Sequence, residues 1–114
     1  MREELMSELV CRQCDQRFAL NSPIWRCTCG GVLDIQYTPH FQPDSLLHRG
    51  STMWRYRDAI CLSPDATLVS FGEGFTPLLE VPIEGRKVWI KQDHLFPTGS
   101  YKDRGASVLI SHIS

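Results

Sequence analysis

Four of the five cysteines form two close pairs, and this spacing constrains the fold more than any other feature of the sequence. Cys11 and Cys14 are separated by two residues and Cys27 and Cys29 by one, with twelve residues between the pairs. Two thiolate pairs at such spacing are typical of a site in which four sulfurs surround one zinc ion. The chain begins with no signal-peptide pattern, which favours metal ligation over a disulfide framework.

The second pair departs from the usual zinc-ribbon spacing because only Thr28 separates its two cysteines. The alternative is a set of reduced thiols that holds no metal. Gly30 and Gly31 favour ligation, since knuckle turns need residues that tolerate positive φ and NH groups that donate to sulfur. Because protein would fill all four positions, the predicted zinc is structural rather than catalytic. The remaining Cys61 is expected to be a lone packing thiol.

Local signals divide the chain into three sections. Residues 1–37 contain the cysteine pairs and end in an alternating segment, 32–37, that is typical of a strand. Residues 38–71 are interrupted by prolines and have one short helical pattern at 51–62, so they are expected to form a connector. Residues 72–114 carry the signals of an α/β domain.

This last section has two strand patterns, 76–81 and 87–91, followed by a loop and a helix pattern at 100–114. Ser100, with Asp103 three residues later, is a capping signal for the start of the helix. Apolar residues then recur with helical spacing at Ala106, Leu109, Ile110 and Ile113. Since no stop signal follows, we expect an incomplete domain that exposes one face of its strand pair and of its helix.

Charge and hydropathy exclude two classes of partner. The 12 basic and 13 acidic residues give a formal net charge of -1, and without a long basic run nucleic-acid binding has no electrostatic support. Apolar runs such as 88–90 are far shorter than the roughly 20 residues that cross a bilayer. We therefore expect a cytoplasmic protein with no nucleic-acid or membrane partner, and we make no prediction of its oligomeric state.

Lys102 is the candidate catalytic residue, at the start of the predicted helix. A lysine in the first turn lies at the positive end of the helix dipole, which favours the neutral amine that Schiff-base chemistry requires. The small residues Gly99 and Ser100 allow a cofactor ring to approach the backbone. From position alone the alternative stays open, because a lysine followed by Asp103 and Arg104 is more often a solvated surface charge.

Two motifs resemble the tryptophan-synthase-β-like, fold type II family of pyridoxal-phosphate enzymes. Residues 97–106, Pro-Thr-Gly-Ser-Tyr-Lys-Asp-Arg-Gly-Ala, resemble its cofactor-lysine motif, and the Lys-Asp-Arg-Gly form is similar to that of threonine synthases. Residues 72–78, Gly-Glu-Gly-Phe-Thr-Pro-Leu, are similar to an upstream motif of the same enzymes. Residues 54–57, Trp-Arg-Tyr-Arg, look like the segment before their catalytic domain. With the cysteine module, the resemblance covers nearly the whole chain.

This resemblance implies an incomplete fragment of a fold type II domain, preceded by a small zinc-ribbon-like β module. It implies a lyase of threonine biosynthesis that converts O-phosphohomoserine and water to threonine and phosphate. Lys102 would hold pyridoxal 5'-phosphate as a Schiff base and move protons at the substrate α and β carbons, and Ser100 and Tyr101 would line the cofactor site. The family's phosphate-binding and ring-binding loops do not occur before Ser114, so we expect the 114-residue chain to be inactive alone.

Other interpretations remain open. Cysteate synthase and threonine dehydratase share the implied fold, although the Lys-Asp-Arg-Gly form and the cysteine module favour the synthases. From a different class, the chain could be a non-catalytic zinc-ribbon interaction module or the remnant of a decayed gene. Among the histidines only His94 lies near the lysine, and residues 54–57 are expected to pack rather than to bind nucleic acid.

Overall fold

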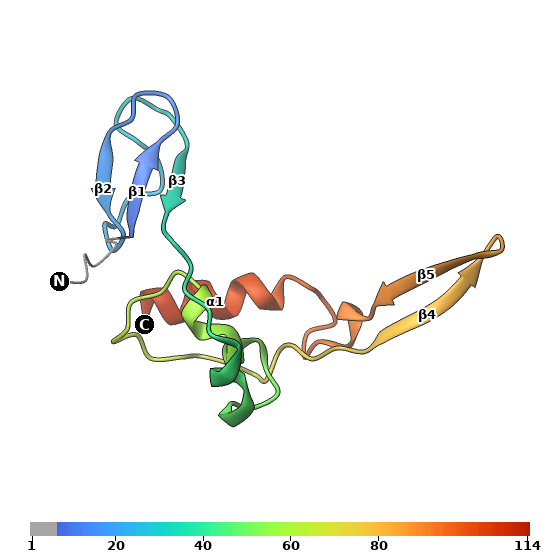
Figure 1. Ribbon diagram of the computed structural model, residues 1–114. Helices are drawn as coiled ribbons and strands as arrows, with labels where there is room; N and C mark the ends of the chain where they lie inside the picture. Colours follow the sequence, from blue (N-terminus) through green and yellow to red (C-terminus); the bar gives the residue numbers. More distant parts are fainter. Residues whose placement is uncertain (1–6) are drawn as a thin grey trace. The chain divides into compact units, whose positions relative to one another are not determined.

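The computed structural model describes residues 7–114, in which short strands, 3₁₀ helices and one α-helix are joined by long loops (Figure 1). The chain divides into two compact units. The cysteine unit comprises Met1–Phe41 and Asp58–Cys61, and the helix unit comprises Gln42–Arg57 and Leu62–Ser114. Residues 1–6, where the sequence shows no signal-peptide pattern, lie outside the described residues. No helix among residues 7–114 is long and apolar enough to cross a membrane.

The cysteine unit is built on an antiparallel sheet of three strands in the order β2-β1-β3. Its strands are β1 (Glu8–Cys11), β2 (Arg17–Ala19) and β3 (Leu33–Gln36), and the last confirms the strand predicted at 32–37. Among the described residues of this unit, the buried apolar side chains are those of Cys11 and Cys27. So small a sheet with so little apolar core needs another source of stability.

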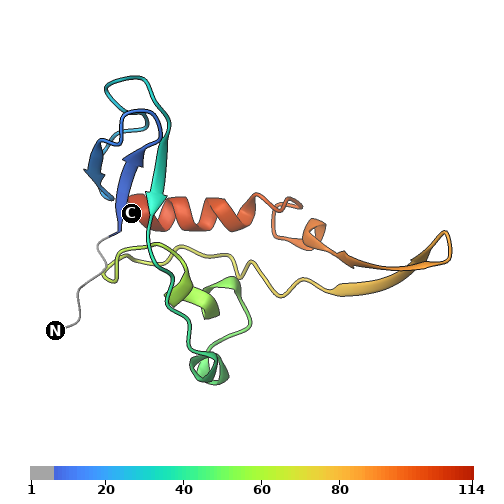
Figure 2. The same ribbon diagram turned by 45° about the horizontal axis from the view of Figure 1, so that its top comes forward.

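The remaining elements follow in the order η1 (Pro43–His48), η2 (Met53–Ala59), β4 (Leu78–Ile83), β5 (Arg86–Lys91), η3 (Asp93–Leu95) and α1 (Asp103–Ile113), and are seen from a second direction in Figure 2. The helical pattern at 51–62 corresponds to η2, which is shorter than predicted and is a 3₁₀ helix. Tyr56 interrupts it with φ -95° and ψ 22°.

Strands β4 and β5 form an antiparallel hairpin around a turn at Glu84 and Gly85, both with positive φ. The hairpin has one apolar face, because paired residues such as Leu79 with Ile90 and Val81 with Val88 lie on the same side. Most side chains of this face are exposed, and the exposed apolar residues of the hairpin are Leu78, Leu79, Ile83, Val88, Trp89 and Ile90. The expected exposure of the strand pair is confirmed.

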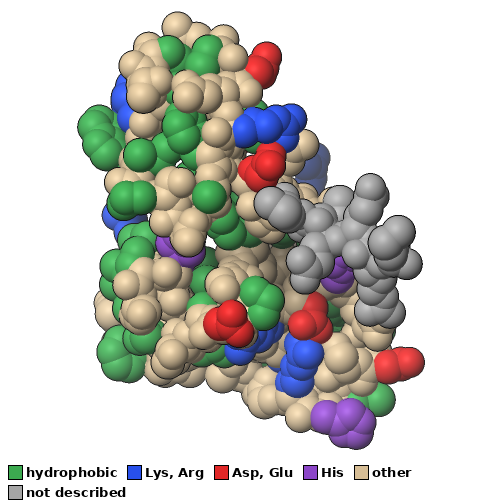
Figure 3. Space-filling view, turned by 90° about the vertical axis from the view of Figure 1, so that its left-hand side faces the viewer, with side chains coloured by type: hydrophobic (Ala, Val, Ile, Leu, Met, Phe, Trp, Pro, Cys, Tyr) green, Lys and Arg blue, Asp and Glu red, His purple; other side chains and the backbone are tan. Residues whose placement is uncertain are grey.

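Helix α1 buries serines rather than its apolar residues. Ser107 Oγ accepts a hydrogen bond from the indole Nε1 of Trp54 at 2.9 Å and donates to Val69 O at 2.6 Å. One turn later, Ser111 Oγ accepts from Val69 N at 2.8 Å. The predicted apolar face is exposed, with Leu109 58% and Ile113 67% accessible. Exposed hydrophobic side chains also occur elsewhere on the molecule, and Figure 3 shows several of them along one side of the surface that it draws.

The start of α1 differs from the predicted cap. The helix begins at Asp103, and Ser100 Oγ instead accepts a hydrogen bond from Lys102 N at 3.2 Å. The carboxylate of Asp103 accepts from both the backbone NH and the hydroxyl of Thr98. The predicted capping box is therefore wrong, because Asp103 fixes the preceding loop instead.

Among the glycines of the helix unit, Gly74 is the one at which a larger residue fits least well. Its φ is 118°, and a Cβ there would lie 2.4 Å from Met53 N, whose NH donates to Glu73 O at 2.8 Å. We expect Gly74→Ala to lower the free energy of unfolding by about 3 kcal/mol through strain and backbone displacement. Chemical denaturation followed by circular dichroism measures the change. Gly50→Ala is the control, because nothing lies within 4 Å of its Cβ; equal effects of the two substitutions would contradict the prediction.

Candidate functional site

The four cysteines predicted as metal ligands lie together in the cysteine unit. Their sulfur atoms are all within 4.8 Å of one another, and the Cys11–Cys29 and Cys14–Cys27 sulfur pairs are each 3.5 Å apart. Four sulfurs bound to zinc at about 2.3 Å in a tetrahedron would be separated by about 3.8 Å. The cluster is thus nearly the right size to hold one metal ion.

Both cysteine turns direct backbone NH groups at sulfur. Gln13 N donates to Cys11 Sγ at 3.4 Å, and Gly31 N donates to Cys29 Sγ at 3.4 Å. The donor follows its cysteine by two positions in each turn. The single residue between Cys27 and Cys29 therefore does not prevent the second turn from presenting sulfur in the manner of the first.

The thiols of the cluster affect one another's ionisation. The backbone NH of Cys14, together with further hydrogen bonds that outweigh burial, lowers the pKa of Cys11 to about 7. The NH of Gln16 lowers the pKa of Cys14, but the neighbouring thiols of Cys27 and Cys29 raise it more, to about 12. One thiolate thus forms readily while a second negative charge is resisted, a situation that a bound divalent cation relieves.

Gly31 is required by the close packing of the cluster. A Cβ at this buried position would lie 2.5 Å from Cys11 Sγ and 3.2 Å from Cys29 Sγ. We expect Gly31→Ala to weaken zinc binding by about tenfold or more, because it separates two of the four sulfurs. Competition with a chromogenic chelator measures the affinity, with Gly50→Ala as control. Unchanged affinity in Gly31→Ala would show that these sulfurs do not share an ion.

Lys102 lies immediately before α1 with its side chain exposed. Its Nζ makes no hydrogen bond or ion pair with any residue from 7 to 114. The other two lysines are engaged, since Lys91 Nζ donates to Thr76 O and Lys87 Nζ lies 3.0 Å from Glu80 Oε1. Among the three lysines, Lys102 is therefore the one whose amine has no hydrogen-bond or ion-pair partner within residues 7–114.

Asp93 connects the two motifs that carry the family resemblance. Its carboxylate accepts two hydrogen bonds of 3.2 Å from the guanidinium of Arg104 and one of 2.5 Å from the hydroxyl of Thr76. Arg104 also stacks on Phe96, 4.8 Å from the ring centroid. Hydrogen bonds from Arg104 and then Thr76 hold the pKa of Asp93 below its ordinary value. Arg104 thus ties the first turn of α1 to the carboxylate of Asp93.

Sequence reasoning did not identify Asp93, although a carboxylate two residues after a strand and next to a basic motif was a usable signal. It also did not single out Glu73, which is 2% exposed. Burial raises the pKa of Glu73, but the hydroxyl of Ser107, the backbone NH groups of Glu73 and Phe71, and the hydroxyl of Ser70 lower it more. The carboxylate is therefore charged at neutral pH.

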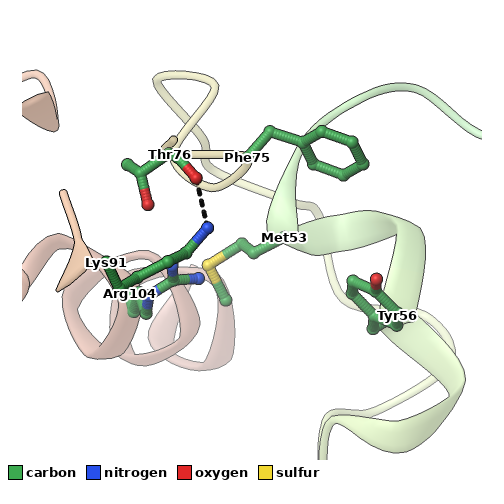
Figure 4. Close-up of a pocket in the computed structure, with 6 residues that line it drawn as sticks. All are labelled: Met53, Tyr56, Phe75, Thr76, Lys91 and Arg104. Atoms are coloured by element: carbon green, nitrogen blue, oxygen red, sulfur yellow. Dashed lines mark hydrogen bonds between the residues drawn. The ribbon is translucent and has the colours of Figure 1, made fainter. Parts of the chain in front are cut away.

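A cavity of about 360 Å³ lies next to this network, lined by Met53, Tyr56, Phe75, Thr76, Lys91 and Arg104 (Figure 4). Figure 4 shows the Lys91 amine pointing to the carbonyl of Thr76. A second cavity, of about 110 Å³, lies beside the first turns of α1. Neither is lined by Ser100, Tyr101 or Lys102, so the assignment of these residues to a cofactor site stays a prediction.

The other residues considered from the sequence are His94, Cys61 and residues 54–57, and none of them lies in the cysteine cluster. His94 is exposed in η3, and Cys61 is a half-buried free thiol. Within residues 54–57 only Trp54 is buried, while Tyr56 is 41% exposed.

Comparison with curated proteins finds threonine synthases. The chain is 32% identical over 108 residues to threonine synthase of Methanocaldococcus jannaschii, a match that covers 86% of the chain and 27% of the relative. It is 31% identical over 112 residues to that of Methanosarcina acetivorans, covering 90% and 27%, and 39% identical over 62 residues to that of Synechocystis, covering 49% and 16%. The chain thus spans about a quarter of the length of the first two relatives. No protein-family model and no solved structure matches it.

Proposed function

This chain is a segment similar to the amino-terminal part of threonine synthases, and from this we infer that it supplies the cofactor lysine, Lys102, of a threonine-synthase-like enzyme. The observation that carries the proposal is which of the three lysine amines has a hydrogen-bond or ion-pair partner. Lys87 and Lys91 are held by Glu80 and the Thr76 carbonyl, whereas the Lys102 amine is exposed and has no partner among residues 7–114.

The residues present fit a covalently held pyridoxal phosphate in part. Lys102 offers a primary amine, with Ser100 and Tyr101 beside it, and the Thr98–Asp103 hydrogen bonds fix the backbone on which these side chains are carried. When bound, the cofactor supplies an electron-accepting ring that stabilises negative charge on the substrate carbon. Groups for its ring nitrogen and phosphate would come from elsewhere in a longer enzyme.

Within that enzyme, Lys102 would move protons at the substrate's α and β carbons. Once substrate has replaced it on the cofactor, its free amine near those atoms can act as base and acid. The Arg104–Asp93 pair would hold the first turn of α1 in place while it does so. The reaction proposed is the conversion of O-phosphohomoserine and water to threonine and phosphate. Cysteate synthase and threonine dehydratase remain the alternatives within this chemistry, and the names of the relatives favour threonine synthase.

We further propose that the cysteine cluster binds one structural zinc ion. The support is the set of four sulfurs within 4.8 Å and the two NH groups that donate to them. With four protein ligands, the ion has no open position for water and takes no part in the reaction. A non-catalytic ribbon module would share this site, but it would have no use for an unpartnered Lys102 within a cofactor-lysine motif.

The 114-residue chain is expected to form no threonine on its own. The apolar faces of the hairpin and of α1 are exposed, and Lys102 lines neither of the two cavities described above. Release of inorganic phosphate from O-phosphohomoserine, with pyridoxal phosphate in excess, is the measurement, and we expect the rate of the blank. Turnover, together with a stoichiometric borohydride-reduced adduct on Lys102, would contradict this prediction.

A further inference from the structure

The smaller cavity lies between residues 69–73 and the first two turns of α1. Its volume is about 110 Å³, and apolar walls are contributed by Val69, Phe71, Ala106 and Ile110. Among its polar groups are two carboxylates, those of Glu73 and Asp103, and no lysine, arginine or histidine lines it. It is thus an apolar space with negative charge and no matching cation.

Glu73 is incompletely hydrogen-bonded in this cavity. Its side chain is almost fully buried, and its Oε2 accepts from Phe71 N at 2.8 Å. Its Oε1 is buried and has no hydrogen-bond partner among residues 7–114. A buried carboxylate oxygen without a donor is costly, so the cavity favours a ligand that brings an N–H group to this oxygen.

No side chain among residues 7–114 places a donor in hydrogen-bonding geometry with this oxygen, although the hydroxyls of Ser107 and Ser70 lie near enough to the carboxylate to lower its pKa. A hydroxyl has one proton, and that of Ser107 is directed to Val69 O at 2.6 Å. Thr98 directs its hydroxyl proton and its backbone NH to the carboxylate of Asp103. The oxygens of Asp103 are therefore occupied, and Glu73 is the group that remains to bind a ligand.

We propose that this cavity binds a protonated primary amine on a short apolar stem, with Glu73 as its anchor. The walls match the stem, and the carboxylate matches the ammonium group. An apolar cavity of about 150 Å³ holds benzene, so about 110 Å³ has room for about four heavy atoms. The amine is either a small free molecule or the end of a lysine side chain. This site is separate from the lysine amine and the zinc cluster of the proposed function.

Ligand-observed saturation-transfer NMR on the 114-residue chain tests the proposal with n-propylammonium as probe. We expect saturation transfer to n-propylammonium, much less to the neutral 1-propanol, and least to propionate. Glu73→Gln should weaken n-propylammonium binding by about tenfold or more, because a charge-assisted hydrogen bond is lost. Glu80→Gln is the matched control: it removes an exposed carboxylate, paired with Lys87, and leaves binding unchanged.

A second variant leaves the carboxylate in place. Ala106 is exposed on α1 and lines the cavity, so Ala106→Leu should fill the space and also abolish binding. Competition by Nα-acetyl-lysine-methylamide distinguishes a free amine from a lysine side chain as the ligand. If the cavity accepts a lysine side chain, this compound displaces n-propylammonium; if the cavity accepts only a small free amine, n-propylammonium stays bound. Binding of n-propylammonium no better than that of 1-propanol, or unaffected by both Glu73→Gln and Ala106→Leu, would overturn the proposal.

Discussion

Removal of zinc is expected to unfold the sheet of the cysteine unit. The three strands are three or four residues long, and the buried apolar side chains among the unit's described residues are those of two cluster cysteines, Cys11 and Cys27. Without an ion this core has little to hold it together. Structural zinc binds with an apparent free energy of about 10–16 kcal/mol near neutral pH, and that energy is available to folding.

Two cysteine substitutions make the test specific. We expect about one equivalent of zinc per chain in protein purified without chelator, and loss of the ion and of dispersed β1–β3 amide resonances in Cys14→Ser. Cys61→Ser is the matched control, because it removes a thiol outside the cluster. Less than about half an equivalent of zinc, or a sheet that survives chelation, would contradict the structural role.

Five of the elements, β3, η2, β4, β5 and α1, could be predicted from the sequence because local patterns determine them. The strands β1 and β2 and the 3₁₀ helices η1 and η3 were not predicted. Alternation identified β3, two strand patterns around a turn identified the hairpin, and apolar spacing identified α1. The Cys-x-x-Cys and Cys-x-Cys pairs predicted a cluster, and their sulfurs do lie together. These features depend on neighbours a few residues away.

The features that could not be predicted depend on distant partners. Ser107 and Ser111 are buried on α1 because Trp54 and Val69 provide hydrogen-bond partners for their hydroxyls. Asp103 does not cap the helix because Thr98 supplies two nearer donors. The unpartnered Oε1 of Glu73 is likewise a result of tertiary packing, which no local pattern shows.

Substitution of Lys102 is expected to abolish threonine formation in an enzyme that contains this segment. A suitable host is the Methanocaldococcus jannaschii relative with its aligned residues replaced by this chain. In this chimera we expect Lys102→Ala to lower the rate of threonine formation about a thousandfold or more, since both the covalent anchor and the proton-transfer group are removed.

Lys87→Ala is the matched control in the same chimera. Lys87 is an exposed lysine of β5 that pairs with Glu80, so its loss is expected to leave the rate unchanged within about twofold. Equal losses of activity in the two variants would indicate a general effect of removing a lysine. A Lys102→Ala chimera that retains its activity would exclude the proposed role.

Borohydride reduction of the chimera in the presence of pyridoxal phosphate, followed by peptide mass mapping, tests the central claim most directly. The reagent fixes the cofactor to the amine that holds it, and this chain offers three lysines. We predict one pyridoxyl group per chain, on Lys102, whose amine has no partner among residues 7–114. A stoichiometric adduct on Lys87, on Lys91 or on a lysine outside this segment would contradict the assignment of Lys102 as the cofactor lysine.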